Sequence, residues 1–127
     1  MDKTMDKTMD KMAVLDLPGA LRRADGDQDL FLVLAGLFLQ ESPKEAAAAR
    51  AALERQDRAG LAAAAHKLKV SVAEMCAPRL FESTKRLEEL GRLGEFAEAL
   101  SVCADVEIRL TEVHAALREL IAGGFPS

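Results

Sequence analysis

A long helical stripe near the C-terminus constrains the fold of this chain most strongly. Apolar side chains recur there every three or four positions, at Phe96, Leu100, Cys103, Val106, Leu110, Val113, Leu117 and Leu120. This spacing places them on one face of an α-helix of about seven turns. A helix of this kind gains most of its stability by packing its apolar face against other elements. We therefore expect the rest of the chain to supply helices that cover it.

Capping residues elsewhere predict the remaining long helices. We expect four of them, over residues 43–56, 58–75, 78–91 and 95–121. Ser42, Pro43 and Glu45 form a capping box with proline at the first helical position. Asp57 is placed to cap the next helix, and Pro78 to begin the one after it. No segment shows strand periodicity, so the sequence predicts an all-α fold, an up-down-up-down four-helix bundle.

The N-terminal part of the chain is expected to add shorter helices over residues 18–24 and about 27–41. Residues 1–12 repeat a charged four-residue unit and read as a disordered or weakly ordered leader. The 127 residues, half of them hydrophobic, fit one core. We assign residues 13–122 to a single domain and residues 123–127 to a frayed tail.

Composition excludes several classes of function. The net charge of −4 argues against wholesale binding of nucleic acid or anionic membranes. The longest apolar run, residues 30–39, is too short for a membrane span, which needs roughly 20 residues. Cys76 and Cys103 lie in apolar-periodic segments, as expected of reduced thiols. We therefore expect a cytoplasmic protein.

His66 is the residue that most invites a chemical interpretation. It lies in the run GLAAAAHKLKVSVAEM, residues 60–75, at the border of a predicted buried seam. Lys69, one turn further on, can place an ammonium beside any group bound to the ring. The surface that a partner would contact around the ring comprises Ala59, Ala62, Ala63, Lys67, Val70 and Ala73. Spacing alone leaves open whether His66 reacts or is a surface histidine among alanines.

Metal binding and nucleotide chemistry find little support in the sequence. On a straight helix His66 and Cys76 lie about 15 Å apart, and Cys103 and His114 about 16 Å apart, so neither pair can share an ion. The chain has no glycine-rich phosphate loop and no serine nucleophile elbow. If His66 takes up a phosphoryl group, another protein must supply it. The sequence predicts no cofactor and no nucleotide-binding or autonomous catalytic site.

Around His66 the chain reads A-H-K-L-K-V-S-V, which resembles the A-H-x-L-K-G-S-A pattern of histidine-containing phosphotransfer (HPt) domains. Ala65, His66, Leu68, Lys69 and Ser71 match in register. Further matches are Phe38, Leu39, Pro43 and Asp57 upstream, and Leu80, Leu87 and Glu88 downstream. The resemblance covers about residues 16–120.

The resemblance implies a phosphorelay intermediate of a two-component system, which is a phosphocarrier rather than a true enzyme. His66 would accept a phosphoryl group from the aspartyl phosphate of a receiver domain and pass it on, and Lys69 would neutralise the arriving phosphate. Glu88 would orient the imidazole, or it is a solvated helix charge. The implied partners are a response-regulator receiver domain, a hybrid sensor histidine kinase, or both. Mg²⁺ is expected on the partner receiver rather than on this chain.

Two residues depart from the family pattern. Val70 replaces the usual glycine four residues after His66, on the same helix face, and Cys76 replaces a glycine that is common at the following turn. The branched side chain of Val70 could obstruct the phosphate. The alternative function is therefore a non-catalytic adaptor that binds a receiver or kinase without phosphotransfer.

The segment LFLVLAGLFL, residues 30–39, is apolar all round. Leu32 and Leu39 share a face that the bundle could leave uncovered, which suggests a homodimer or a larger partner. The other interpretation is that the N-terminal residues Val14, Leu15 and Leu17 cover this face.

Overall fold

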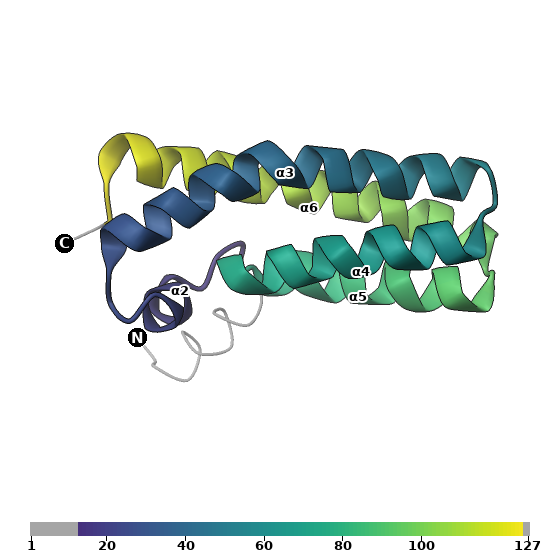
Figure 1. The fold of residues 1–127 in the computed structure, drawn as a ribbon, viewed down its shortest axis with the longest axis horizontal. Helices are drawn as coiled ribbons and strands as arrows, with labels where there is room; N and C mark the ends of the chain where they lie inside the picture. Colours follow the sequence, from purple (N-terminus) through teal and green to yellow (C-terminus); the bar gives the residue numbers. More distant parts are fainter. Residues whose placement is uncertain (1–12, 126–127) are drawn as a thin grey trace.

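Four long antiparallel helices pack around one apolar core (Figure 1). The computed structural model describes residues 13–125, which form α2 (Leu17–Arg23), α3 (Gln28–Glu54), α4 (Arg58–Met75), α5 (Pro78–Leu93) and α6 (Phe96–Gly123). In Figure 1, α3 and α6 run along one side of the bundle, and α4 and α5 run along the other. The predicted all-α four-helix bundle is confirmed. None of the helices in residues 13–125 has the length and apolar character that crossing a membrane requires.

Local capping defines the start of α4, as predicted, and the end of α5. Asp57 Oδ1 accepts a hydrogen bond from the backbone N–H of Gly60 at 2.9 Å, so α4 begins at Arg58. Gly94 ends α5 with a positive φ of 72°, a conformation that favours glycine. These two caps set where α4 begins and where α5 ends, at the same end of the antiparallel pair.

The predicted break before residue 43 is wrong, because α3 is continuous from Gln28 to Glu54. Ser42 does not cap a helix: it is fully buried, and its Oγ lies 2.8 Å from His114 Nε2 on α6. Glu45 instead accepts a hydrogen bond from Ser71 Oγ on α4 at 3.3 Å. Pro43 sits inside the helix, and its ring crowds the carbonyl four residues earlier, which favours a bend. In Figure 1 the N-terminal part of α3 is indeed inclined to the rest.

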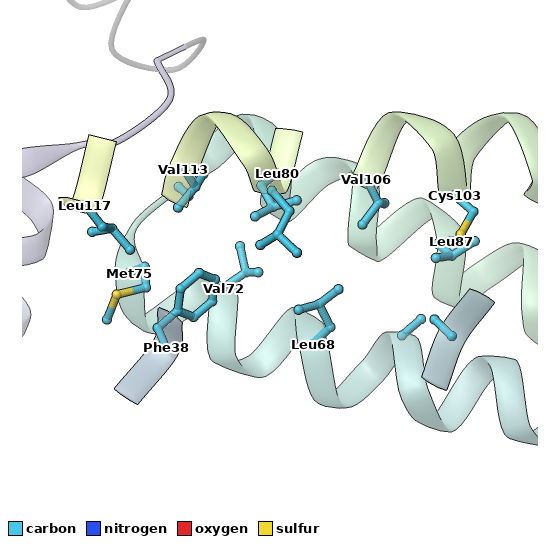
Figure 2. Packing of buried hydrophobic residues seen from close by; sticks show 14 of the residues in the cluster. Phe38, Leu68, Val72, Met75, Leu80, Leu87, Cys103, Val106, Val113 and Leu117 are labelled. Carbon is cyan, nitrogen blue, oxygen red and sulfur yellow. The ribbon is translucent and has the colours of Figure 1, made fainter. Parts of the chain in front are cut away.

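The core is built from the predicted apolar stripes (Figure 2). Its buried members on the two sides of the bundle include Phe38, Leu68, Val72, Met75, Leu80, Leu87, Cys103, Val106, Val113 and Leu117. One position of the α6 stripe is corrected: Leu100 is half exposed, and Ala99 is buried in its place.

Residues 13–16 before α2, and Phe125 after α6, pack at the same end of the bundle (Figure 1). The backbone N–H of Asp16 donates to the carbonyl of Cys76 at 2.7 Å, which ties the start of α2 to the end of α4. The ring of Phe125 packs edge-on against Phe31, with centroids 5.7 Å apart. Gly123 is the last helical residue of α6, and the predicted tail, residues 123–127, lies partly outside the described residues. The predicted leader, residues 1–12, lies outside the described residues.

The uncovered apolar face of α3 is not the predicted one. Leu32 and Leu39 are half-buried against the core. Leu30, Val33 and Leu37 are the large apolar side chains of α3 that remain exposed.

Candidate functional site

His66 stands on the surface of α4 at the seam with α5. Its neighbours Ala65 and Leu68 are fully buried, which fixes the rotation of α4 about its axis. One step around the helix from Ala65, the imidazole has 57% of its side-chain surface exposed. A partner protein can therefore reach the ring directly.

Glu88, one of the residues predicted for the site, contacts the ring from the neighbouring helix. Its side chain is 7% exposed, and its Oε2 lies 3.0 Å from His66 Nδ1. Leu87 and Leu90 on either side of it are buried, so α5 holds the carboxylate firmly at this position. A residue 22 positions away in sequence is thus placed beside the ring by helix packing.

The contact with Glu88 selects one tautomer of His66. An ionised carboxylate can only accept a hydrogen bond, so Nδ1 carries the proton and donates it. The second nitrogen, Nε2, then keeps its lone pair and has no hydrogen-bond partner among residues 13–125. The ring presents an unprotonated nitrogen outward, which is what a nucleophile requires.

Two cations share the same carboxylate. Lys69 Nζ lies 2.7 Å from Glu88 Oε1, and Arg92 Nη1 lies 2.7 Å from Oε2. In this state the ammonium of Lys69 is therefore held against Glu88, one turn from His66, rather than extended above the ring. Arg92 was missed by the sequence reasoning. Its spacing of four residues from Glu88 on one helix was the signal that could have found it.

Glu88 stays ionised because its cationic partners outweigh its burial. Burial alone would raise the pKa of this carboxyl, but the contacts with Lys69, His66 and Arg92 lower the pKa below its usual range. Glu88, Lys69 and Arg92 are one anion and two cations, so together they carry a net charge of +1 beside the ring.

Gly91 allows α4 and α5 to approach closely beside this cluster. A Cβ at Gly91 would lie 3.0 Å from Leu61 Cγ and 3.1 Å from the backbone nitrogen of Ala62. Gly91 lies between Glu88 and Arg92 on α5. The absence of a side chain there keeps the carboxylate within reach of the ring on α4.

The predicted partner surface surrounds the ring. Ala59, Ala63, Lys67 and Val70 are exposed, and Ala62 and Ala73 are half-buried. Val70 is 50% exposed and stands one turn from His66, yet the ring remains open to solvent. The structure therefore places all six residues around the histidine, with short side chains on most of the approach.

Neither cysteine belongs to this cluster. Cys76 ends α4 in the left-handed conformation, with a φ of 53°, and Cys103 is buried in the core. That conformation gives a reason why glycine is common at the position of Cys76. Within residues 13–125, no three His, Cys, Asp or Glu side chains gather where they could hold a metal ion.

Comparison with known proteins agrees with this geometry. The family model described as the Hpt domain matches residues 33–122. The chain is similar to the solved structure of histidine-containing phosphotransfer protein B from Pseudomonas aeruginosa PAO1, with 26% sequence identity and a TM-score of 0.80, over 86% of this chain and 95% of that chain. It is also similar to the HPT domain of a sensor hybrid histidine kinase from Shewanella, with 18% identity and a TM-score of 0.76, over 86% and 94% of the two chains. The latter likeness shows the fold alone. No curated protein sequence matches this chain.

Proposed function

The chain belongs to the Hpt domain family, and from this premise we propose that it is a phosphorelay intermediate with His66 as its phosphoacceptor. The observation that carries the proposal is the 3.0 Å contact between His66 Nδ1 and Glu88 Oε2 beside an exposed ring. It leaves Nε2 as an unprotonated nucleophile that faces solvent.

In the proposed reaction one phosphoryl group moves from a receiver domain to His66. His66 Nε2 donates its lone pair to the phosphorus of an aspartyl phosphate on a receiver domain, and an N–P bond forms. The bond between phosphorus and the aspartyl oxygen breaks, and the receiver's carboxylate leaves as an anion. The proton on Nδ1 stays in its hydrogen bond with Glu88. The same steps in reverse pass the phosphoryl group on.

Glu88 supports this reaction in two ways. It holds the proton on Nδ1, and its negative charge stabilises the positive charge that the ring develops as Nε2 bonds to phosphorus. Lys69 and Arg92 would counter the charge of the phosphoryl oxygens, from their positions against the carboxylate. The sequence predicted this charge-neutralising role for Lys69 alone, and we now propose it for Arg92 as well.

Receiver domains and a hybrid sensor histidine kinase are the proposed partners. Both partners are those that membership of the Hpt domain family suggests. Mg²⁺ would act from the receiver, where the leaving carboxylate is. The cytoplasmic location expected from sequence remains a prediction.

Phosphotransfer from a loaded receiver tests the proposal. Receiver domains of the source organism, labelled with radioactive acetyl phosphate and Mg²⁺, are mixed with this protein. We expect a label on the protein that acid removes and alkali does not. His66→Gln should abolish it, whereas His114→Gln should leave it in place. A label that persists in His66→Gln would exclude His66 as the acceptor.

Val70 supports one alternative, a non-catalytic adaptor. Its side chain is 50% exposed beside His66, at the position where the family pattern has glycine. An adaptor of this kind would still bind a receiver but would accept no phosphate. Binding that survives His66→Ala, together with no label on the wild-type protein, would favour the adaptor.

A further inference from the structure

The outward face of α3 is more apolar than a surface helix needs. Leu30, Val33 and Leu37 are 45%, 61% and 52% exposed. Their spacing of three and four residues places them on one face, opposite the buried Phe31 and Phe38. No element among residues 13–125 covers this stripe. A contiguous exposed apolar face of this kind marks an interaction surface.

Gly36 is a second and independent anomaly on the same helix. It lies inside α3, where glycine weakens a helix relative to alanine. A Cβ at Gly36 would meet no heavy atom within 4 Å, so packing within the fold does not require glycine there. Its φ is also not positive. A glycine that the fold itself does not need is explained if another helix approaches the backbone at this point.

Two exposed charges on α3 point to a second copy of this helix as the partner. Asp29 lies seven positions before Gly36, and Lys44 lies seven positions after Leu37. Lys44 also pairs with Glu41 on its own helix at 3.5 Å, but both side chains are largely exposed, so this pair is weak. When two copies of α3 run antiparallel, a register that places Asp29 of each copy beside Lys44 of the other also brings Gly36 and Leu37 of both copies together at the two-fold axis. In the same register Leu30 lies opposite Pro43 of the other copy and Val33 lies opposite Gln40, and both of these residues are exposed.

We propose that this face of α3 binds a second copy of the chain to form an antiparallel, two-fold symmetric homodimer. At the axis, Gly36 lets the two backbones approach, and Leu37 of each copy packs across it. On either side of the axis, Leu30 and Val33 of each copy would pack against Pro43 and the aliphatic part of Gln40 of the other. The charged pairs at the ends favour a second copy over an unrelated apolar partner.

The proposed dimer leaves both phosphoacceptor sites accessible. His66 lies at the seam between α4 and α5, whereas the stripe on α3 points away from the bundle axis. Figure 1 shows α3 on the other side of the bundle from α5. The dimer would therefore present two copies of His66 to its partners.

Sedimentation equilibrium over a concentration series tests the dimer. A contact made by one helix pair is small, so the series should extend from about 10 μM to about 1 mM. We expect a monomer–dimer equilibrium in the wild-type protein, and Leu37→Lys should weaken it about tenfold or more by placing two ammonium groups at the axis. Ile108→Lys changes an equally exposed aliphatic residue (60%) on α6 and should leave the equilibrium unchanged. Circular dichroism checks that each variant is folded.

Charge exchange tests the register. Asp29→Lys and Lys44→Asp should each weaken the dimer several-fold, and the double variant should restore it, because each new pair is again of opposite charge. A monomer at every concentration would overturn the proposal. A dimer that Leu37→Lys leaves intact, or a double variant without rescue, would overturn the proposed interface.

Discussion

Glu88 organises the site through a single carboxylate that contacts His66, Lys69 and Arg92. Two of these partners were identifiable from sequence, because the family pattern points to His66 and Lys69. The sharing of one carboxylate among three groups was not, since it depends on the exact approach of α5 to α4. The spacing of residues along a helix predicts which side chains share a face. It does not predict which oxygen of the Glu88 carboxylate each of them contacts.

Replacing Glu88 should slow phosphotransfer without removing the acceptor. In Glu88→Ala nothing holds the proton on Nδ1, and the ring can rotate, so we expect transfer to fall by about tenfold or more. In Glu88→Gln an acceptor oxygen remains for the Nδ1 proton, so the rate of phosphotransfer should fall less. Stopped-flow or rapid-quench transfer from a labelled receiver measures both rates. Glu89→Ala, on the same helix, is the matched control, and equal rates in Glu88→Ala and Glu89→Ala would refute a positioning role.

Val70 should act as a steric brake on transfer. Val70→Ala shortens the side chain beside the ring and keeps a good helix former, whereas Val70→Gly removes it and weakens the helix by a few tenths of a kcal/mol relative to valine. We expect both variants to transfer faster than wild type, with receiver affinity measured in parallel by titration. Rates that match wild type in both would show that Val70 does not obstruct the phosphate.

His114 should make the stability of the bundle depend on pH. Burial, together with nearby Arg118, lowers the pKa of His114 below its usual 6.5. The unfolded chain therefore binds more protons than the folded one between that lowered pKa and pH 6.5, so the free energy of unfolding falls as pH drops through this window. Urea titrations between about pH 5 and pH 8 should show this slope. His114→Gln retains a partner for Ser42 and should flatten the slope; an unchanged slope would exclude His114 as its source.

At the scale of elements, three of the four long helices were predicted to within about two residues at each end, a common margin for helix boundaries. Local signals made this possible, as at Asp57 and Pro78. The start of α3 was also predicted, but its continuity through residues 42 and 43 was not. Ser42 and Pro43 have the chemistry of a helix start, but Ser42 is used instead by His114, 72 positions away. A contact across the bundle therefore outweighed a local signal.

The two glycines within α5 and α3 should respond oppositely to alanine. Gly91→Ala places a Cβ 3.1 Å from the backbone of Ala62, so α4 and α5 must separate slightly. We expect a net loss of about 1 kcal/mol after the gain in helix propensity is included. Gly36→Ala meets open space and should stabilise the monomer by up to about 1 kcal/mol. Chemical denaturation of dilute protein measures both changes, and a Gly91→Ala variant as stable as Gly36→Ala would contradict the close α4–α5 packing.

At the scale of the whole molecule, helical periodicity and short loops were sufficient to predict the bundle. They were not sufficient to predict which pairs fix its geometry, such as the bidentate Arg50–Glu107 pair between α3 and α6, at 2.7 and 3.0 Å. The exposed apolar residues of α3 could not be predicted either, because their exposure depends on how the helix is rotated about its axis in the folded bundle. The resulting molecule has separate faces: the α4–α5 seam with His66, and the outward side of α3.

The isomer of phosphohistidine tests the central claim most directly. The protein is labelled with ¹⁵N, phosphorylated by a loaded receiver, and analysed by long-range ¹H–¹⁵N correlation, which distinguishes the two ring nitrogens of each histidine. The account predicts phosphate on Nε2 of His66, with the proton retained on Nδ1, and an unmodified His114. Phosphate on Nδ1 of His66, or on His114, would contradict it.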